Sequence, residues 1–237
     1  MLDYDGTIAP FHTDRNRAYP YPGVLPILQK IIHCERTRVI FISGRPLAEL
    51  RTLLTPMNGV EMWGSHGLEH QLNDGSYRRV EVDEESAATL AAAERWVIAA
   101  GLMPRAEIKL GGIAIHWRGI PPAKTRSIEA QTLAEWTPLA SRRGLKLLRF
   151  EGGLELRVSH PDKGDAVRSV LTKLDPDLPV AYLGDDLTDE DAFRALAGRG
   201  LSVLVREANR ETDAEARITP PQELIDFLEQ WLNRISA

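Results

Sequence analysis

The stretch VAYLGDD, residues 180–186, joins four mainly apolar residues to a glycine and two aspartates. A short apolar run of this kind is typical of a strand that is buried on both faces of a parallel sheet. In open parallel sheets, ligands bind outside the carboxyl ends of the strands. The stretch therefore predicts an α/β fold in which Asp185 and Asp186 lie at a binding crevice.

The same pattern occurs elsewhere in the chain. Residues 39–42 form an apolar run that ends at Ser43, residues 201–205 form another, and the opening MLDYDGT carries Asp3 and Asp5. Residues 24–32 and 166–174 have apolar side chains at helical spacing. Strands that alternate with helices predict a Rossmann-like parallel-sheet core, with the polar residues of three strand ends in one crevice.

The middle of the chain has a different pattern. We expect a hairpin around residues 73–75, an alanine-rich helix over 84–100, a strand over 113–117, and a helix from 123 that Pro138 ends or kinks. Strands are also expected at 145–150 and 154–158. The pattern predicts a core of residues 1–82 and 159–237, with residues 83–158 inserted as a small α/β domain.

Composition excludes some classes of function. The chain has 237 residues, a net charge of −5 and a single cysteine, Cys34. An acidic protein is a poor nucleic-acid binder, because phosphate backbones are held by clustered Lys and Arg. No apolar stretch approaches the roughly 20 residues of a membrane helix. With no leader segment visible, we expect a cytoplasmic protein whose partners are small molecules and cations, with no nucleic acid and no membrane.

The clustered acids predict a bound cation. Each pair of like charges about 4 Å apart costs on the order of 4 kcal/mol at an effective dielectric near 20. Carboxylates suit Mg²⁺, and Lys163, which opens a helix behind the N-cap Asp162, can face an anion. Together with Ser43 these groups form a cradle for a phosphoryl group, with a carboxylate as nucleophile. A glycosyltransferase that uses Asp-x-Asp, or a non-catalytic binding domain, stays open as an alternative.

Four motifs in order resemble those of the haloacid dehalogenase-like phosphatases. They are Asp3-x-Asp5-Gly6-Thr7, Ser43-Gly44-Arg45, Lys163-Gly164, and Gly184-Asp185-Asp186 followed by Asp189. The resemblance implies that Asp3 is the nucleophile and a Mg²⁺ ligand, and that Asp5 is the general acid and base and offers its carbonyl to Mg²⁺. It implies that Ser43 and Lys163 hold the phosphoryl oxygens, that Asp185 binds the metal, and that Asp186 and Asp189 complete its shell. Asp189 could instead simply start a helix. Gly44 and Arg45 are candidates for substrate binding.

The inserted segment resembles the cap of the trehalose-6-phosphate phosphatases. The matching stretches include GSHGLE, AEIKLGGIAIHWR, GLELR and YLGDDLTDEDAF. The resemblance implies hydrolysis of trehalose 6-phosphate, with Glu107, Lys109 and Glu155 on the sugar hydroxyls and weaker candidates at His116 and Arg118. It also implies a possible pairing with a trehalose-phosphate synthase. A phosphatase for sucrose phosphate or mannosyl-3-phosphoglycerate is the nearest alternative.

The start of the chain is short for a catalytic strand. Only Met1 and Leu2 precede Asp3, whereas a buried central strand commonly has about five or six residues. We therefore expect the natural start to lie upstream, and added upstream residues to raise stability and activity.

Overall fold

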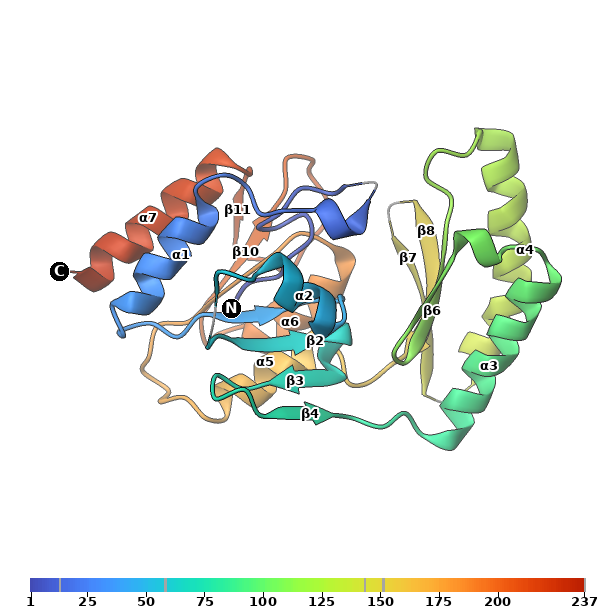
Figure 1. Ribbon diagram of the computed structural model, residues 1–237, viewed down its shortest axis with the longest axis horizontal. Coiled ribbons are helices and arrows are strands. Elements are labelled where there is room, and N and C mark those ends of the chain that lie inside the picture. Colours follow the sequence, from blue (N-terminus) through green and yellow to red (C-terminus); the bar gives the residue numbers. More distant parts are fainter. Residues whose placement is uncertain (13, 58, 143, 151, 237) are drawn as a thin grey trace. The chain divides into compact units, whose positions relative to one another are not determined.

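The computed structural model describes residues 1–12, 14–57, 59–142, 144–150 and 152–236 (Figure 1). The chain folds into two compact units, one formed by Met1–Arg79 with Pro161–Ala237 and the other by Val80–His160. The second unit is thus inserted between the two parts of the first. The predicted fold class, an α/β parallel-sheet core with an inserted small α/β domain, is confirmed.

The first unit is built on parallel strands. β9 (Ala181–Gly184) pairs with β10 (Leu201–Val205), which pairs with β11 (Ala216–Ile218), all in parallel. β1 (Ile40–Ile42) pairs in parallel with β2 (Glu61–Gly64). Leu2 forms parallel bridges to Phe41 and to Leu183, so the short N-terminal segment lies between β1 and β9. Asp3 consequently leaves the sheet between two other strand ends.

An antiparallel hairpin extends the β2 edge. β3 (Glu69–Gln71) pairs with β2 and with β4 (Tyr77–Arg79), and the turn lies at the expected place, where the Asp74 side chain accepts a hydrogen bond from the Ser76 backbone N–H. Short 3₁₀ helices complete the unit: η1 (Arg15–Arg17), η2 (Ser65–Gly67) and η4 (Leu187–Asp189).

Helices cover both faces of this sheet. One face packs against α1 (Val24–His33), α2 (Leu47–Leu53) and α7 (Gln222–Ser236), the other against α5 (Lys163–Leu171) and α6 (Glu190–Leu196). Alternate residues of a strand point to opposite faces. Phe41 therefore belongs to the first core, whereas Ile40 and Ile42 belong to the second. Two-sided burial explains why β1 is apolar throughout.

The inserted unit is a four-stranded antiparallel sheet in the order β5 (Ala106–Lys109), β6 (Gly112–His116), β8 (Gly153–Val158), β7 (Leu145–Phe150). The helices α3 (Glu84–Ala99) and α4 (Pro122–Ala140) cover one face of it, and η3 (Met103–Arg105) precedes β5 (Figure 1). Pro138 lies in the last turn of α4, which ends two residues later at Ala140. A proline at this position removes a single backbone hydrogen bond. Burial of the helix face that carries Trp136 can offset that loss.

A largely apolar hollow of about 210 Å³ lies beside the N-terminus. Met1 lines it together with residues of both helical layers, among them Leu28, Val170 and Trp231. The Met1 ammonium donates a hydrogen bond of 2.7 Å to the Ala181 carbonyl, as a strand residue would. Burial lowers the pKa of this ammonium to about 5. Among the described helices, none is both long and apolar enough to cross a membrane.

Candidate active site

Three carboxylates meet at the carboxyl ends of the central strands. Asp3 follows Leu2 and donates its backbone N–H to the Leu183 carbonyl at 2.9 Å, while Asp185 follows β9 directly. One carboxylate oxygen from each of Asp3, Asp185 and Asp189 lies within 4.8 Å of the others, and all three residues are buried. The structure therefore brings these three predicted site residues together.

Lys163 is the cation of this cluster. It is the first residue of α5, where the Asp162 and Asp165 side chains form a reciprocal capping box. Its Nζ lies 2.8 Å from Asp3 Oδ1 and 2.7 Å from Asp189 Oδ1, and the residue is 2% exposed. Burial alone would lower the pKa of Lys163, but the Asp189 and Asp3 carboxylates outweigh it and raise the pKa above the ordinary value. Lys163 is thus held charged against two buried acids.

The acids outnumber this lysine, and their protonation reflects it. Burial raises the pKa of Asp3 to about 7, with Asp189 and Asp5 adding to the shift and Lys163 opposing it. Burial likewise raises the pKa of Asp185 well above the ordinary value, and the neighbouring charges of Asp3 and Asp189 raise it further. Burial first, and neighbouring negative charge second, thus disfavour the charged form of these acids, and a bound cation would favour it.

The residues fit a hard divalent cation. Asp185 Oδ1 is buried and has no hydrogen-bond partner in the described part of the chain. Gly6, at φ +76°, lies so close that a Cβ there would come 2.0 Å from Asp185 Oδ2. The donor set is entirely carboxylate oxygen, which such cations prefer. The acidic cluster could therefore hold one divalent ion between Asp3 and Asp185.

Asp189 has an organising position within the cluster. Its Oδ2 accepts the backbone N–H groups of Asp185 and Asp186 at 3.1 and 3.0 Å, and its Oδ1 accepts from Lys163 and from the Tyr182 hydroxyl at 2.6 Å. Asp186 is only half-buried and caps η4 by accepting the Leu187 N–H. The metal-shell roles expected for these two residues stay predictions, and Tyr182 is a site residue that the sequence interpretation missed.

The second acid of the first motif faces a different cation. Arg45 forms a bidentate ion pair with Asp5, in which Nε donates to Oδ2 and Nη2 donates to Oδ1, both at 2.6 Å. Its Nη1 also donates to the Arg15 carbonyl and to Glu49. Arg45 is 4% exposed. The substrate contact predicted for Arg45 stays a prediction. In the structure, its guanidinium is paired with Asp5.

Ser43 and Gly44 lie at the end of β1 as expected. Ser43 is buried, donates its N–H to the Trp63 carbonyl, and accepts the Arg45 N–H on its Oγ at 3.2 Å. A Cβ on Gly44 would come 2.5 Å from the His66 ring, so the motif needs glycine at this position for close packing.

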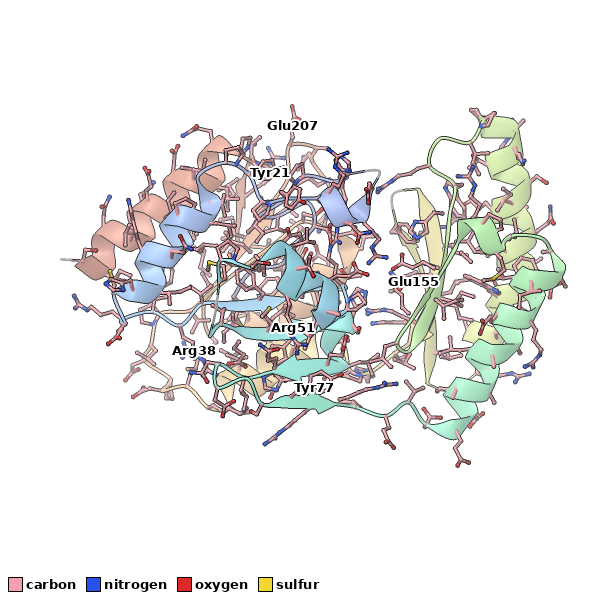
Figure 2. The ribbon with its side chains drawn as sticks, viewed as in Figure 1. Tyr21, Arg38, Arg51, Tyr77, Glu155 and Glu207 are labelled. Atoms are coloured by element: carbon pink, nitrogen blue, oxygen red, sulfur yellow. The ribbon has the colours of Figure 1, made fainter. Side chains whose placement is uncertain are left out.

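The predicted sugar-binding residues share one face of the inserted sheet, opposite α3 and α4. Glu107 and Glu155 flank Ala114 in register, and Lys109 Nζ donates to Glu155 Oε1 at 2.9 Å. Glu155 lies on the side of this sheet that faces away from α3 and α4 (Figure 2). His116 Nε2 lies 3.0 Å from Glu107 Oε2. Burial would raise the pKa of Glu155, but Lys109 and Arg157 outweigh it and lower the pKa. Arg118 follows β6 and packs against Gly152.

A core sheet with acids at its strand ends and an inserted α/β unit defines the haloacid dehalogenase-like fold class. A solved haloacid dehalogenase-like hydrolase from B. subtilis superimposes with a TM-score of 0.65 at 15% identity, over 96% of this chain and 98% of that one. The solved C-terminal domain of C. albicans trehalose-6-phosphate phosphatase gives a TM-score of 0.82 at 21% identity, over 98% of this chain and 90% of that one.

The family follows from the sequence comparison. The family model for trehalose-phosphatase matches residues 1–221, and the chain belongs to that family. The trehalose-phosphate phosphatase of Mycobacterium marinum is 30% identical over 253 residues, which cover 100% of this chain and 62% of that protein. The chain thus spans about three fifths of the length of that curated relative.

Proposed function

We propose that the chain is a Mg²⁺-dependent phosphatase that hydrolyses trehalose 6-phosphate to trehalose and phosphate through an aspartyl-phosphate intermediate. The observation that carries the proposal is the buried cluster of Asp3, Lys163 and Asp185 at the strand ends of a trehalose-phosphatase family chain. Asp3 lies beside Lys163 and beside Asp185, whose Oδ1 has no hydrogen-bond partner among the described residues. A buried carboxylate in this setting is suited to attack a phosphoryl group whose charge must be neutralised.

In the first half of the reaction, an Asp3 carboxylate oxygen attacks phosphorus and the bond to the sugar oxygen breaks. Asp5 gives its proton to that leaving oxygen, and Lys163 and Ser43 hold the phosphoryl oxygens. In the second half, Asp5 takes a proton from water, which attacks phosphorus and releases Asp3 and phosphate. Mg²⁺, held by Asp3, the Asp5 carbonyl and Asp185 with Asp186 and Asp189 around them, would supply positive charge for the phosphoryl oxygens.

The inserted unit is proposed as the cap that selects the ester. Its sheet face carries Glu107, Lys109 and Glu155, already ordered by ion pairs, and charged groups of this kind bind sugar hydroxyls through strong hydrogen bonds. His116 and Arg118 are proposed as accessory contacts of the disaccharide. Gly44 and Arg45 are retained as substrate-binding candidates of the core.

The test is phosphate release from trehalose 6-phosphate with Mg²⁺ and with EDTA, beside sucrose 6-phosphate, mannosyl-3-phosphoglycerate and glucose 6-phosphate. We expect Mg²⁺-dependent release that is fastest with trehalose 6-phosphate, and none with Asp3→Asn. A preference for another ester would overturn the proposed substrate assignment, and phosphate release in EDTA would overturn the proposed Mg²⁺ dependence. Turnover that requires a nucleotide sugar would favour a glycosyltransferase instead.

A further inference from the structure

The loop after β10 lies outside the four sequence motifs, yet one of its residues contacts the backbone of the candidate cation site. Arg210, whose side chain is 16% exposed, donates from Nη2 to the Asp186 carbonyl at 3.0 Å and to the Asp185 carbonyl at 3.5 Å. Its Nη1 donates to the Glu190 carboxylate and to the Glu211 carbonyl. One guanidinium therefore joins its own loop to the backbone of two acids of the site.

Glu190 fixes this guanidinium in place. The Glu190 side chain is almost fully buried at the start of α6, and besides Arg210 it accepts the Thr212 hydroxyl at 2.8 Å and the Asp213 N–H at 2.7 Å. A buried ion pair with further hydrogen bonds on the carboxylate has little freedom to rearrange. The loop of residues 210–213 is thereby locked to the first turn of α6.

The backbone at Asp185 and Asp186 is consequently held from two directions. Asp189 accepts both of their N–H groups, and Arg210 binds both of their carbonyls. These contacts use the main chain and leave Asp185 Oδ1 without a partner among the described residues. Holding the peptide groups on both sides fixes the direction of the Asp185 side chain.

We propose that Arg210 is a positioning residue for the cation site, and that the Mg²⁺ affinity of the protein depends on its hydrogen bonds to the main-chain carbonyls of Asp185 and Asp186. The inference rests on the proposed Mg²⁺ site at Asp3 and Asp185. Groups that orient metal ligands typically change metal affinity about 10- to 100-fold when they are replaced. Arg210 lies in the polar stretch REANRETD, which gives no sequence signal for such a role.

The test measures Mg²⁺ binding to the full chain by titration calorimetry, before any turnover. Arg210→Met is expected to raise the dissociation constant for Mg²⁺ about 10-fold or more. Arg194→Met is the matched control, because Arg194 of α6 also binds this loop, through Asp213, while its other contact, Asp191, lies on α6 itself. We expect Arg194→Met to bind Mg²⁺ as the wild type does.

Arg210→Lys guards against a variant that does not fold. Lysine keeps the charge but carries its donors on a single nitrogen, so it cannot reach Glu190 and both carbonyls in the way that the planar guanidinium does. The Mg²⁺ affinity of Arg210→Lys should therefore fall between those of the wild type and Arg210→Met. Unchanged Mg²⁺ affinity in both Arg210 variants, or an equal loss in Arg194→Met, overturns the positioning role alone. A wild type that does not bind Mg²⁺ overturns the proposed metal site, and this inference with it.

Discussion

Replacing Asp3 by asparagine is expected to make the metal-free protein more stable while it abolishes turnover. Asp3 is 3% exposed, and burial raises its pKa from 3.8 to about 7. Between these two values the folded state binds more protons than the unfolded state, so stability falls as the pH rises through this window. The full penalty for the charged form is present above about pH 7.

The size of the effect follows from that shift. One pKa unit corresponds to about 1.4 kcal/mol, so ionised Asp3 lowers the free energy of unfolding by at most about 4 kcal/mol near pH 8. Asparagine removes the charge and keeps an oxygen that can accept from Lys163. Its amide nitrogen adds a buried donor, which costs about 1–2 kcal/mol if it finds no partner. The expected net gain is about 2 kcal/mol near pH 8, and it should nearly vanish near pH 5.5.

Urea unfolding in EDTA near pH 8 and near pH 5.5 measures this gain. Asp5→Asn is the matched control two residues away. Because Asp5 accepts both prongs of the buried Arg45, that variant should lose stability at both pH values. Adding Mg²⁺ should stabilise the wild type more than Asp3→Asn. The reasoning is refuted if Asp3→Asn is the less stable protein near pH 8 in EDTA, or if its advantage does not shrink with acidification.

Three further outcomes are expected. Lys163→Met leaves Asp3 and Asp189 buried without their cation, so it should lose about 3–5 kcal/mol in urea unfolding, and a variant as stable as wild type would contradict this. Apolar residues added before Met1 should fill the hollow and raise Tm by more than an added Gly-Ser segment does. Between about pH 5 and pH 8 the buried Met1 ammonium binds fewer protons in the folded state than in the unfolded state, so it makes stability rise with pH. The added residues should abolish this rise. Glu155→Gln should raise the KM for trehalose 6-phosphate about 10-fold and leave the KM for p-nitrophenyl phosphate unchanged. The control Glu129→Gln on α4 should change neither KM, and equal effects of Glu155→Gln on both esters would argue against sugar recognition.

The sheet and its polar strand ends could be predicted because their signals are local. An apolar run followed by a polar residue identifies a buried strand and its carboxyl end, and topology then collects such ends at one edge. This is how Asp3 and Asp185, far apart in sequence, could be expected in one cluster, which the structure contains. Pro138 was expected to end or kink the second helix of the inserted unit, and α4 ends two residues after it, at Ala140.

The partners of these acids could not be predicted, since they depend on tertiary contacts. Tyr182 offered a partial signal: a tyrosine in an apolar, two-sided strand needs a partner for its hydroxyl, and Asp189 provides it. Arg45 stands in a recognisable motif, yet only the folded chain shows that its guanidinium grips Asp5. Arg210 comes from an irregular loop, where neither period nor spacing marks its role.

The charges around the strand ends account for the fit to a divalent cation. Asp3 contacts Lys163 and Asp5 contacts Arg45, so the two acids of the motif meet different buried cations. Asp185 and Asp189 add two carboxylates without adding a cation, apart from the lysine shared by Asp3 and Asp189. Asp186 adds a further negative charge close enough to raise the pKa of Asp185, so the acids around these strand ends outnumber Lys163 and Arg45, and a divalent ion would reduce this excess. Burial is the main reason why the pKa values of Asp3 and Asp185 rise, and the neighbouring carboxylates raise them further. Burial and the excess of negative charge together disfavour the ionised acids of the metal-free fold, and a divalent ion bound there would stabilise their charged form.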